Sequence, residues 1–349
     1  MLANRWRRAH WRLPNRPVFT DTERFRHHEP LQGVLSARPA LSAQDVSFCH
    51  GRHDVLSGPV RASECAHRHS RNATALAVAR AGIIGQNSWG GDQYGYNGRS
   101  RADRLLSHDG TSTIKGLVWE PERTRGSRRV APRGVIQIVH GMVEHVGRYD
   151  EFARFLVEQG FVVCAADHIG HGKSVASADE LGCLPVDGKE TLIEDVHELR
   201  KTVTARYSRQ TPYIMFGHSM GSFVTRAYLA RHGEDVAAAV ICGTGQQPLV
   251  LSKAGNALAR FLAKTKGADY RSKLLDNMGV GAFAKQIENP RTPHDWVCTD
   301  PAVVDAYIAD ELCGAMFSVG GYATLTDLTG EVVSPSCAAK VPKGLPVLF

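Results

Sequence analysis

One short stretch, Gly217-His218-Ser219-Met220-Gly221, constrains this chain more than any other part of the sequence. It has the pattern G-x-S-x-G, with an apolar run at 212–216 before it and a helix-compatible run at 222–232 after it. A serine on a sharp turn between a strand and a helix has an exposed hydroxyl, and the glycines let the two elements approach closely. The N-terminus of the following helix also favours negative charge. The pattern therefore predicts that Ser219 is a catalytic nucleophile.

Strands and helices alternate along the middle of the chain. Asp109-Gly110 separates two apolar runs within 104–119, which predicts a β-hairpin. Buried strands are expected at 135–139, 161–166, 212–216 and 236–242, and helices at 149–159, 192–207 and 222–232. Such alternation is typical of the α/β class, in which helices flank a mostly parallel sheet. We place this core at residues 101–247.

Residues 248–340 break the alternation. An apolar helical stripe runs through Ala254, Leu258, Phe261 and Leu262, and further helices are expected at 276–287 and 301–313. A segment of this length is too long for a simple loop, so we predict an inserted helical cap over 248–340. The apolar run within 341–349 is expected to begin the next core strand.

The first hundred residues differ in composition from the rest. They carry 14 Arg, no Lys and 7 acidic residues, which accounts for the whole formal net charge of +7. We interpret 1–100 as a low-order basic extension or a translated stretch outside the natural protein. A basic arm that binds nucleic acid or membrane is an alternative, but its charges form no helical face. Charge is balanced over 101–349, so no nucleic-acid partner is expected there.

The composition predicts a globular protein, and the spacing of its motifs indicates neither a metal nor a cofactor. The 43% hydrophobic content supports a sizeable core, and no run approaches the ~20 apolar residues of a membrane span. The eight cysteines are scattered singly, which fits reduced thiols and a cytoplasmic location. The Cys/His residues within 49–69 match no zinc-finger spacing. The loop with His168 and His171 lacks the G-x-G-x-x-G spacing of dinucleotide sites, so no dinucleotide is expected there. The two histidines are expected to form hydrogen bonds that shape the loop beside the catalytic site.

The loop after the strand at 135–139 is expected to complete the site around Ser219. A serine on such a turn takes one oxyanion-hole N–H from this loop and the other from the residue that follows the nucleophile. These donors are Met142 and Met220. The neighbours expected to shape the site are His140, Gly141, Glu144, His145, Gly217, His218 and Gly221.

The segment from about 104 to 349 resembles the monoglyceride lipase and lysophospholipase group of α/β-hydrolases, which is catalogued with the serine aminopeptidase family. The shared residues are 140–145, Arg148-Tyr149, 167–174, 217–221, 289–292 and Asp295-Trp296. The resemblance implies hydrolysis of the carboxylic ester of a small single-chain lipid. It also implies that Leu258, Phe261 and Leu262 belong to a lid that shelters the acyl chain. Transient contact of this lid with a membrane surface is left open.

A serine nucleophile needs a histidine base and an acid that orients it. By resemblance the acid follows the strand that begins at Pro346, and the histidine follows a later strand. After Ser219 the chain has only His232, at the end of a helix, and His294, in the cap, and neither is expected to be the base. We therefore expect that the triad Asp and His are absent from this chain and that it is inactive as given. A peptidase, a short-chain esterase, or a non-catalytic protein that binds a lipid or a partner remain alternatives.

Overall fold

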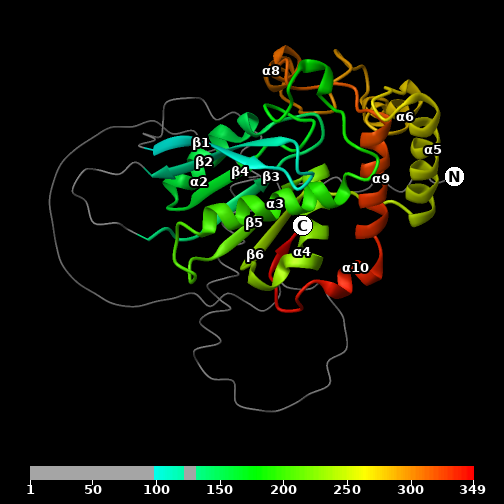
Figure 1. The fold of residues 1–349 in the computed structure, drawn as a ribbon. Coiled ribbons are helices and arrows are strands. Elements are labelled where there is room, and N and C mark those ends of the chain that lie inside the picture. The colour runs from blue at the N-terminus through cyan, green and yellow to red at the C-terminus, as the bar shows by residue number, and fades with distance from the viewer. Residues whose placement is uncertain (1–97, 122–130) are drawn as a thin grey trace, which may run out of the picture. The chain divides into compact units, whose positions relative to one another are not determined.

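The computed structural model describes residues 98–121 and 131–349 (Figure 1). The Cys/His residues within 49–69 and nearly all of the predicted extension lie outside this part, so the expectations for them stay predictions. No helix in the described part is long and apolar enough to span a bilayer.

The described residues form a seven-stranded sheet in the order β1-β2-β4-β3-β5-β6-β7. β1 (Gly98–Leu106) and β2 (Thr113–Pro121) pair antiparallel, which confirms the predicted hairpin, and β2 also runs antiparallel to β4. The other strands are parallel to one another: β3 (Val135–Val139), β4 (Val162–Ala166), β5 (Tyr213–His218), β6 (Ala238–Cys242) and β7 (Val347–Leu348). The predicted α/β class is therefore confirmed.

Helices cover both faces of the sheet because alternate residues of its central strands point to opposite sides. Val135 and Val139 belong to one apolar cluster, together with buried residues of α3 (Lys189–Thr204) and α4 (Met220–His232). Ile136 and Ile138 belong to a second cluster on α2 (Asp150–Glu158). This explains why β3 is a continuous apolar run, since a parallel strand is buried on both faces. Short 3-10 turns, Val146–Tyr149, Ala178–Glu180 and Gly233–Asp235, complete the connections.

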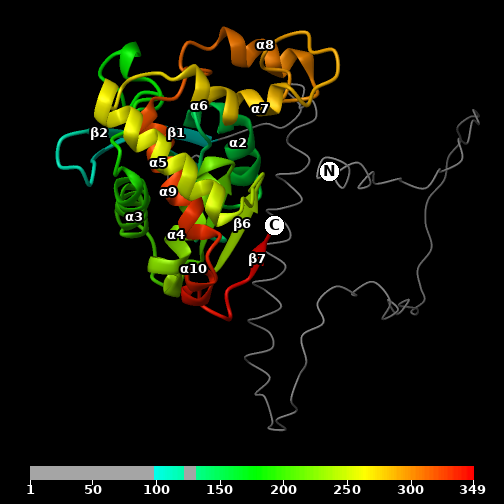
Figure 2. The same ribbon diagram turned by 90° about the vertical axis from the view of Figure 1, so that its right-hand side faces the viewer.

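The chain between β6 and β7 is mostly helical (Figure 2). It contains α5 (Leu249–Lys266), α6 (Lys273–Met278), α7 (Gly281–Ala284), α8 (Pro301–Ala309), α9 (Val319–Val332) and α10 (Pro335–Lys340). The helix expected over 276–287 is therefore two short helices, interrupted at Gly279. The helix expected over 301–313 begins at Pro301, after the N-cap Asp300, but ends at Ala309 because Asp310 has extended backbone angles.

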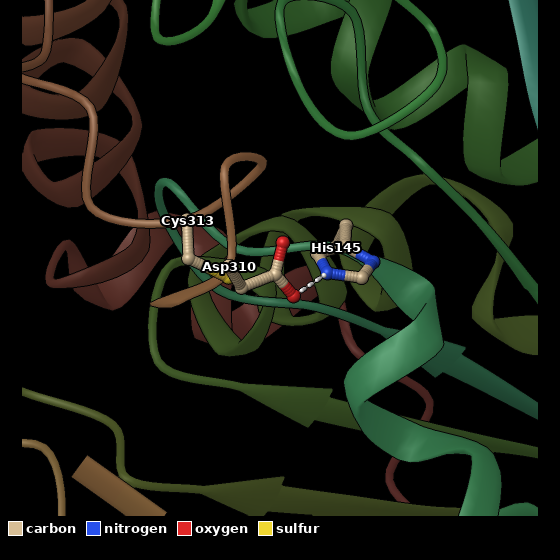
Figure 3. A group of neighbouring side chains, drawn as sticks. All are labelled: His145, Asp310 and Cys313. Atoms are coloured by element: carbon tan, nitrogen blue, oxygen red, sulfur yellow. Dashed lines mark hydrogen bonds and ion pairs between the residues drawn. The ribbon is translucent and has the colours of Figure 1, made fainter. Parts of the chain in front are cut away.

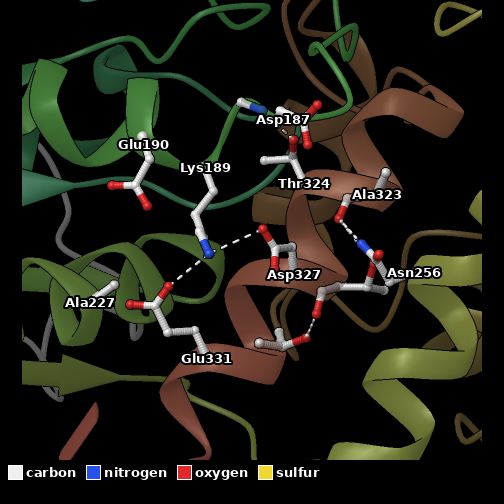
Figure 4. Close-up of polar contacts among 12 residues, drawn as sticks. Asp187, Lys189, Glu190, Ala227, Asn256, Ala323, Thr324, Asp327 and Glu331 are labelled. Carbon is white, nitrogen blue, oxygen red and sulfur yellow. Dashed lines mark hydrogen bonds and ion pairs between the residues drawn. The ribbon is translucent and has the colours of Figure 1, made fainter. Parts of the chain in front are cut away.

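α9 joins α5 to the core (Figure 4). The Asn256 side-chain amide on α5 donates to the Ala323 carbonyl oxygen at 2.7 Å. On the other side, Lys189 at the start of α3 forms ion pairs with Asp327 and Glu331, at 3.1 and 2.8 Å. The long helix α5 is therefore fixed to the core through α9.

Candidate active site

Ser219 lies on the turn between β5 and α4. Its φ of 51° and ψ of −119° place it in a region that non-glycine residues rarely adopt. The turn is held by hydrogen bonds: the Ser219 N–H donates to the Cys242 carbonyl oxygen at 3.0 Å, and the Ser222 N–H donates to the Ser219 carbonyl oxygen at 2.9 Å. The strained residue is thus tied both to β6 and to the first turn of α4.

Two glycines make this turn sterically possible. A Cβ atom on Gly217 would lie 2.6 Å from the Gly221 carbonyl oxygen. A Cβ atom on Gly221 would lie 2.0 Å from the carbonyl oxygen of Val139, the last residue of β3. Both distances are far below van der Waals contact, so the start of α4 can approach β3 and β5 only when both positions are glycine.

The loop that follows β3, residues 140–146 and called here the β3 loop, passes directly beside Ser219. A Cβ atom on Gly141 would lie 3.2 Å from the Ser219 Cβ atom. Among the hydrogen bonds of the described residues, none uses the Met142 N–H or the Ser219 hydroxyl. Met220 is the first residue of α4, where backbone N–H groups have no partner within the helix. The two predicted oxyanion donors therefore flank Ser219.

Glu144 is the polar centre of the β3 loop. Its carboxylate accepts hydrogen bonds from the Gly141 N–H at 2.5 Å and the Tyr149 hydroxyl at 2.7 Å, and it pairs with the Arg148 guanidinium. His218 Nδ1 lies 3.3 Å from the same carboxylate. Burial alone would raise the pKa of Glu144, but the hydrogen bond and charge of His218, and the charge of Arg148, outweigh it and hold that pKa well below its usual value. Glu144 is therefore a buried anion that fixes the loop.

Three buried histidines connect the β3 loop to the loop after β4. His140 donates from Nδ1 to the Gly141 carbonyl oxygen at 2.8 Å and accepts the His168 N–H at Nε2, at 3.0 Å. His168 Nε2 lies 3.2 Å from the His140 carbonyl oxygen, and His171 Nδ1 lies 2.8 Å from that of Ile169. Burial lowers the pKa of all three rings, that of His140 to about 3. They are neutral at physiological pH and act as structural donors and acceptors.

Asp167, at the end of β4, joins the same two loops. It accepts the Val146 N–H at Oδ1 and the Lys173 N–H at Oδ2, both at 2.8 Å. Asp167 lies within the shared motif 167–174, but no role was predicted for it. Its position directly after a buried strand was the available signal, because the carboxyl ends of parallel strands carry site residues.

A cavity of about 690 Å³ opens between the β3 loop and the helices that follow α5. Met142 and Val143 form its wall on the loop side. Its other lining side chains are mostly apolar with a few polar ones, including Val280, Ile287, Trp296, Phe317, Asp276, Lys285 and His294. The cavity thus adjoins the residue predicted to donate one oxyanion hydrogen bond.

The expectation that Leu258, Phe261 and Leu262 line an acyl pocket stays a prediction. None of the three is among the residues that line this cavity. Leu258 and Leu262 pack against the apolar cluster shared with α9, and Phe261 is 62% exposed. Packing against α9 accounts for the buried side of the apolar stripe of α5.

The side chains of His218, His232 and His294 do not contact the Ser219 hydroxyl. The His218 ring faces Tyr149, whose hydroxyl lies 3.0 Å from Nδ1. His232 ends α4, bonds to Glu194 at 2.8 Å and stacks on His197. His294 lines the cavity, with its ring centroid 5.5 Å from that of Tyr307. In the described part of the chain, no hydrogen bond links a histidine to the Ser219 hydroxyl.

One group of side chains has the composition of a metal site (Figure 3). The ligand atoms of His145, Asp310 and Cys313 lie within 4.8 Å of one another. However, the Gly147 N–H donates to His145 Nδ1 at 3.1 Å, so the ring hydrogen is on Nε2, which donates to Asp310 at 2.7 Å. A metal at Nε2 needs a lone pair there and the ring hydrogen on Nδ1. Burial raises the pKa of Cys313 to about 12, so its thiol is also protonated. The residues fit a hydrogen-bonded contact better than a metal centre.

A strained serine between a strand and a helix of a mostly parallel sheet, covered by helices on both faces, defines an α/β-hydrolase. The family described as serine aminopeptidase, S33, matches residues 130–348. This chain belongs to that family.

Comparison with individual proteins agrees with this assignment. The chain is 31% identical over 213 residues to a monoacylglycerol lipase of Mycolicibacterium smegmatis, covering 61% of this chain and 65% of the relative. It is 27% identical over 195 residues to the monoglyceride lipase of Homo sapiens, covering 54% and 56%. The chain thus matches between 56 and 65% of the length of these curated relatives.

A solved structure supports the fold. The crystal structure of a highly thermostable carboxyl esterase from Bacillus coagulans, in complex with glycerol, has a TM-score of 0.64 and 30% sequence identity to this chain. The superposition covers 71% of this chain and 78% of the esterase. The resemblance to monoglyceride lipases and α/β-hydrolases noted from the motifs is therefore confirmed.

Proposed function

We propose that this chain belongs to an enzyme that hydrolyses the carboxylic ester of a single-chain lipid, such as a monoacylglycerol or a lysophospholipid. Ser219 is the nucleophile, and the N–H groups of Met142 and Met220 stabilise the oxyanion. The observation that carries the proposal is the conformation of Ser219, a strained serine at the first turn of α4 and beside the β3 loop. Strain of this kind is found where function requires it.

The oxyanion donors supply the electrostatic part of the mechanism. When the Ser219 oxygen adds to an ester carbonyl, negative charge develops on the carbonyl oxygen. Two backbone N–H groups that already point at this position need no reorganisation, and removing one such donor typically costs about 3 kcal/mol of transition-state stabilisation. Gly141 contributes because its missing side chain lets the β3 loop approach Ser219.

The substrate class is supported by the cavity and by the relatives. The cavity beside Met142 is lined largely by apolar side chains, which suits an acyl chain, and its few polar groups suit a small alcohol. Two relatives are named as monoacylglycerol or monoglyceride lipases, and the similar esterase structure holds glycerol. Large exposed apolar side chains of α5 and α6, Val250, Phe261, Leu274 and Met278, support transient contact of the predicted cap with lipid surfaces.

We also propose that this chain has a low activity. Ser219 is a weak nucleophile until a base removes its proton, and in the described part no histidine is hydrogen-bonded to it. Loss of the base and its orienting acid slows serine hydrolases by about 10⁴- to 10⁶-fold. The nucleophile and the oxyanion donors are retained, so slow Ser219-dependent chemistry is expected, and added imidazole should accelerate it.

The test is covalent labelling of the chain by a fluorophosphonate probe, with and without imidazole, and with Ser219→Ala as the control. We expect slow labelling that imidazole accelerates and that Ser219→Ala abolishes. Monoacylglycerols of increasing chain length should slow the labelling by competition more strongly than short esters or peptides do. Equal labelling of wild type and Ser219→Ala would refute the assignment of Ser219 as the nucleophile. Stronger competition by peptides or short esters than by monoacylglycerols would favour the peptidase or short-chain esterase alternatives.

A further inference from the structure

Val143, directly after the proposed oxyanion donor Met142, is held in a strained conformation from outside its own loop. Its φ is 47°, a left-handed value that is unusual for a β-branched residue. Its carbonyl oxygen accepts two hydrogen bonds, from the Tyr307 hydroxyl at 3.2 Å and from the Gly314 N–H at 3.0 Å. Both donors belong to residues 307–314, which include the end of α8 and are called here the α8 segment. Strained residues persist only where their surroundings fix them, and here the α8 segment does so.

A second contact joins the same two segments (Figure 3). His145 Nε2 donates to Asp310 Oδ2 at 2.7 Å, and Asp310 Oδ1 accepts the Leu312 N–H at 3.0 Å. The ring of Tyr307 also lies under the Arg148 guanidinium, 4.9 Å from the centroid. The α8 segment thus contacts the β3 loop at Val143 and His145, and Arg148 just beyond it.

The core holds the opposite side of the β3 loop. At one end, His140 Nε2 accepts the His168 N–H at 3.0 Å. At the other end, the Val146 N–H donates to Asp167 at 2.8 Å. The direction of the Met142 N–H depends on the backbone angles of the residues between these anchors. The core fixes the two ends of this stretch, and the α8 segment fixes its middle at Val143.

We propose that Tyr307, Asp310 and Gly314 are positioning residues for the oxyanion hole, so that the α8 segment sets the direction of the Met142 N–H. The catalytic meaning of this inference rests on the proposed function, whereas the coupling of the two segments does not. A change in the α8 segment, which lies close to the cavity through Tyr307 and Gly314, therefore alters the geometry of the transition-state donor. Occupancy of the cavity and alignment of the Met142 N–H are therefore coupled.

The first test is hydrogen–deuterium exchange of the whole chain, comparing Tyr307→Phe with Tyr322→Phe. Tyr307→Phe removes the hydroxyl that donates to Val143 and keeps the ring beside Arg148. Tyr322→Phe is the matched control, since its hydroxyl donates to Asp276 at 3.1 Å and does not contact the β3 loop. Loss of one hydrogen bond corresponds to about fivefold faster opening. We expect this acceleration in peptides covering 141–147 for Tyr307→Phe but not for Tyr322→Phe.

The second test separates positioning from general stability. In imidazole-assisted labelling of Ser219, Tyr307→Phe should lower the maximal rate about fivefold and leave the probe concentration at half-saturation unchanged. Asp310→Asn, which keeps an acceptor oxygen for His145, should give a smaller change in the same direction. Exchange that accelerates only within 307–314, or equally in both tyrosine variants, would overturn the proposal. If Ser219 is not labelled at all, the proposed function fails, while the exchange result still decides the coupling.

Discussion

Replacement of Glu144 by Gln tests whether a buried anion holds the β3 loop. The Glu144 side chain is only 4% exposed, and its partner Arg148 is 25% exposed. Breaking a buried ion pair by removing one charge costs about 3–5 kcal/mol. Gln keeps one acceptor oxygen, and water reaches Arg148, so we expect the lower end, about 3 kcal/mol. For a folded unit of 150–250 residues this corresponds to a fall in melting temperature of roughly 6–12 °C.

A matched control separates the effect of burial from the loss of a charge. Glu198→Gln also removes a carboxylate that forms an ion pair, with Lys201, but here the two side chains are 38% and 54% exposed. Exposed pairs contribute little, so we expect a change below about 0.5 kcal/mol. Both variants would be compared with the wild type by thermal or urea unfolding followed by circular dichroism.

The pH dependence of the stability difference between wild type and Glu144→Gln is a stricter test that the Glu144 anion is responsible. Folding lowers the pKa of Glu144 from its ordinary value of 4.5. Its stabilisation is therefore complete above pH 4.5 and is lost as the pH falls towards the folded-state pKa. The stability difference between wild type and Glu144→Gln should therefore shrink as the pH falls below about 4.5. Equal destabilisation by both Gln variants, or a difference that persists unchanged at pH 3, would refute this reasoning.

Two further substitutions address the sheet and a buried acid. Gly221→Ala places a Cβ atom 2.0 Å from the Val139 carbonyl oxygen and should destabilise the fold by about 3 kcal/mol or more, whereas Gly344→Ala, with no atom within 4 Å, should have no effect on the melting temperature. Burial raises the pKa of Asp195 to about 6, against opposing hydrogen bonds from the His108 N–H and the Ser107 hydroxyl. The folded protein then binds a proton between about pH 6 and 4 that the unfolded chain does not. The stability of Asp195→Asn relative to wild type should therefore rise by about 2 kcal/mol from pH 4 to pH 8 in urea titrations. A relative stability of Asp195→Asn that is independent of pH would contradict the second prediction.

Much of the fold could be predicted because its central strands are buried on both faces. A fully buried parallel strand such as β3 or β5 is a short apolar run, and the amphipathic helices α2 and α3 have a clear 3.6-residue period. Asp109-Gly110 marked the hairpin for a local reason, since the Asp109 carboxylate accepts the N–H groups of Thr111 and Ser112, both at 2.7 Å. Each of these signals lies within a few residues of the structure that it predicts.

The sequence is less informative where the partner of a segment lies far away in the chain. The apolar stripe of α5 indicated a buried face, but periodicity does not identify the neighbouring element, which is α9. Likewise, nothing in the sequence around Tyr307 or Asp310 indicates a bond to Val143 or His145, more than 160 residues earlier. Contacts between distant segments depend on the folded arrangement, so these positioning residues could be found only in the structure.

The pairing of β6 with β7 has a consequence for how such enzymes diversify. Ala239 lies opposite Val347 and Val240 opposite Leu348. The residues between these parallel strands therefore leave the sheet at the carboxyl end of β6 and rejoin it at the amino end of the adjacent strand β7. Closing a chain between two fixed points costs only about 0.6 kcal/mol more for each doubling of its length. Insertions or deletions distant from α9 and the α8 segment can therefore accumulate while the sheet and the serine turn stay intact. The walls of the cavity can therefore change in sequence without disturbing the sheet, except at the points where they contact the β3 loop.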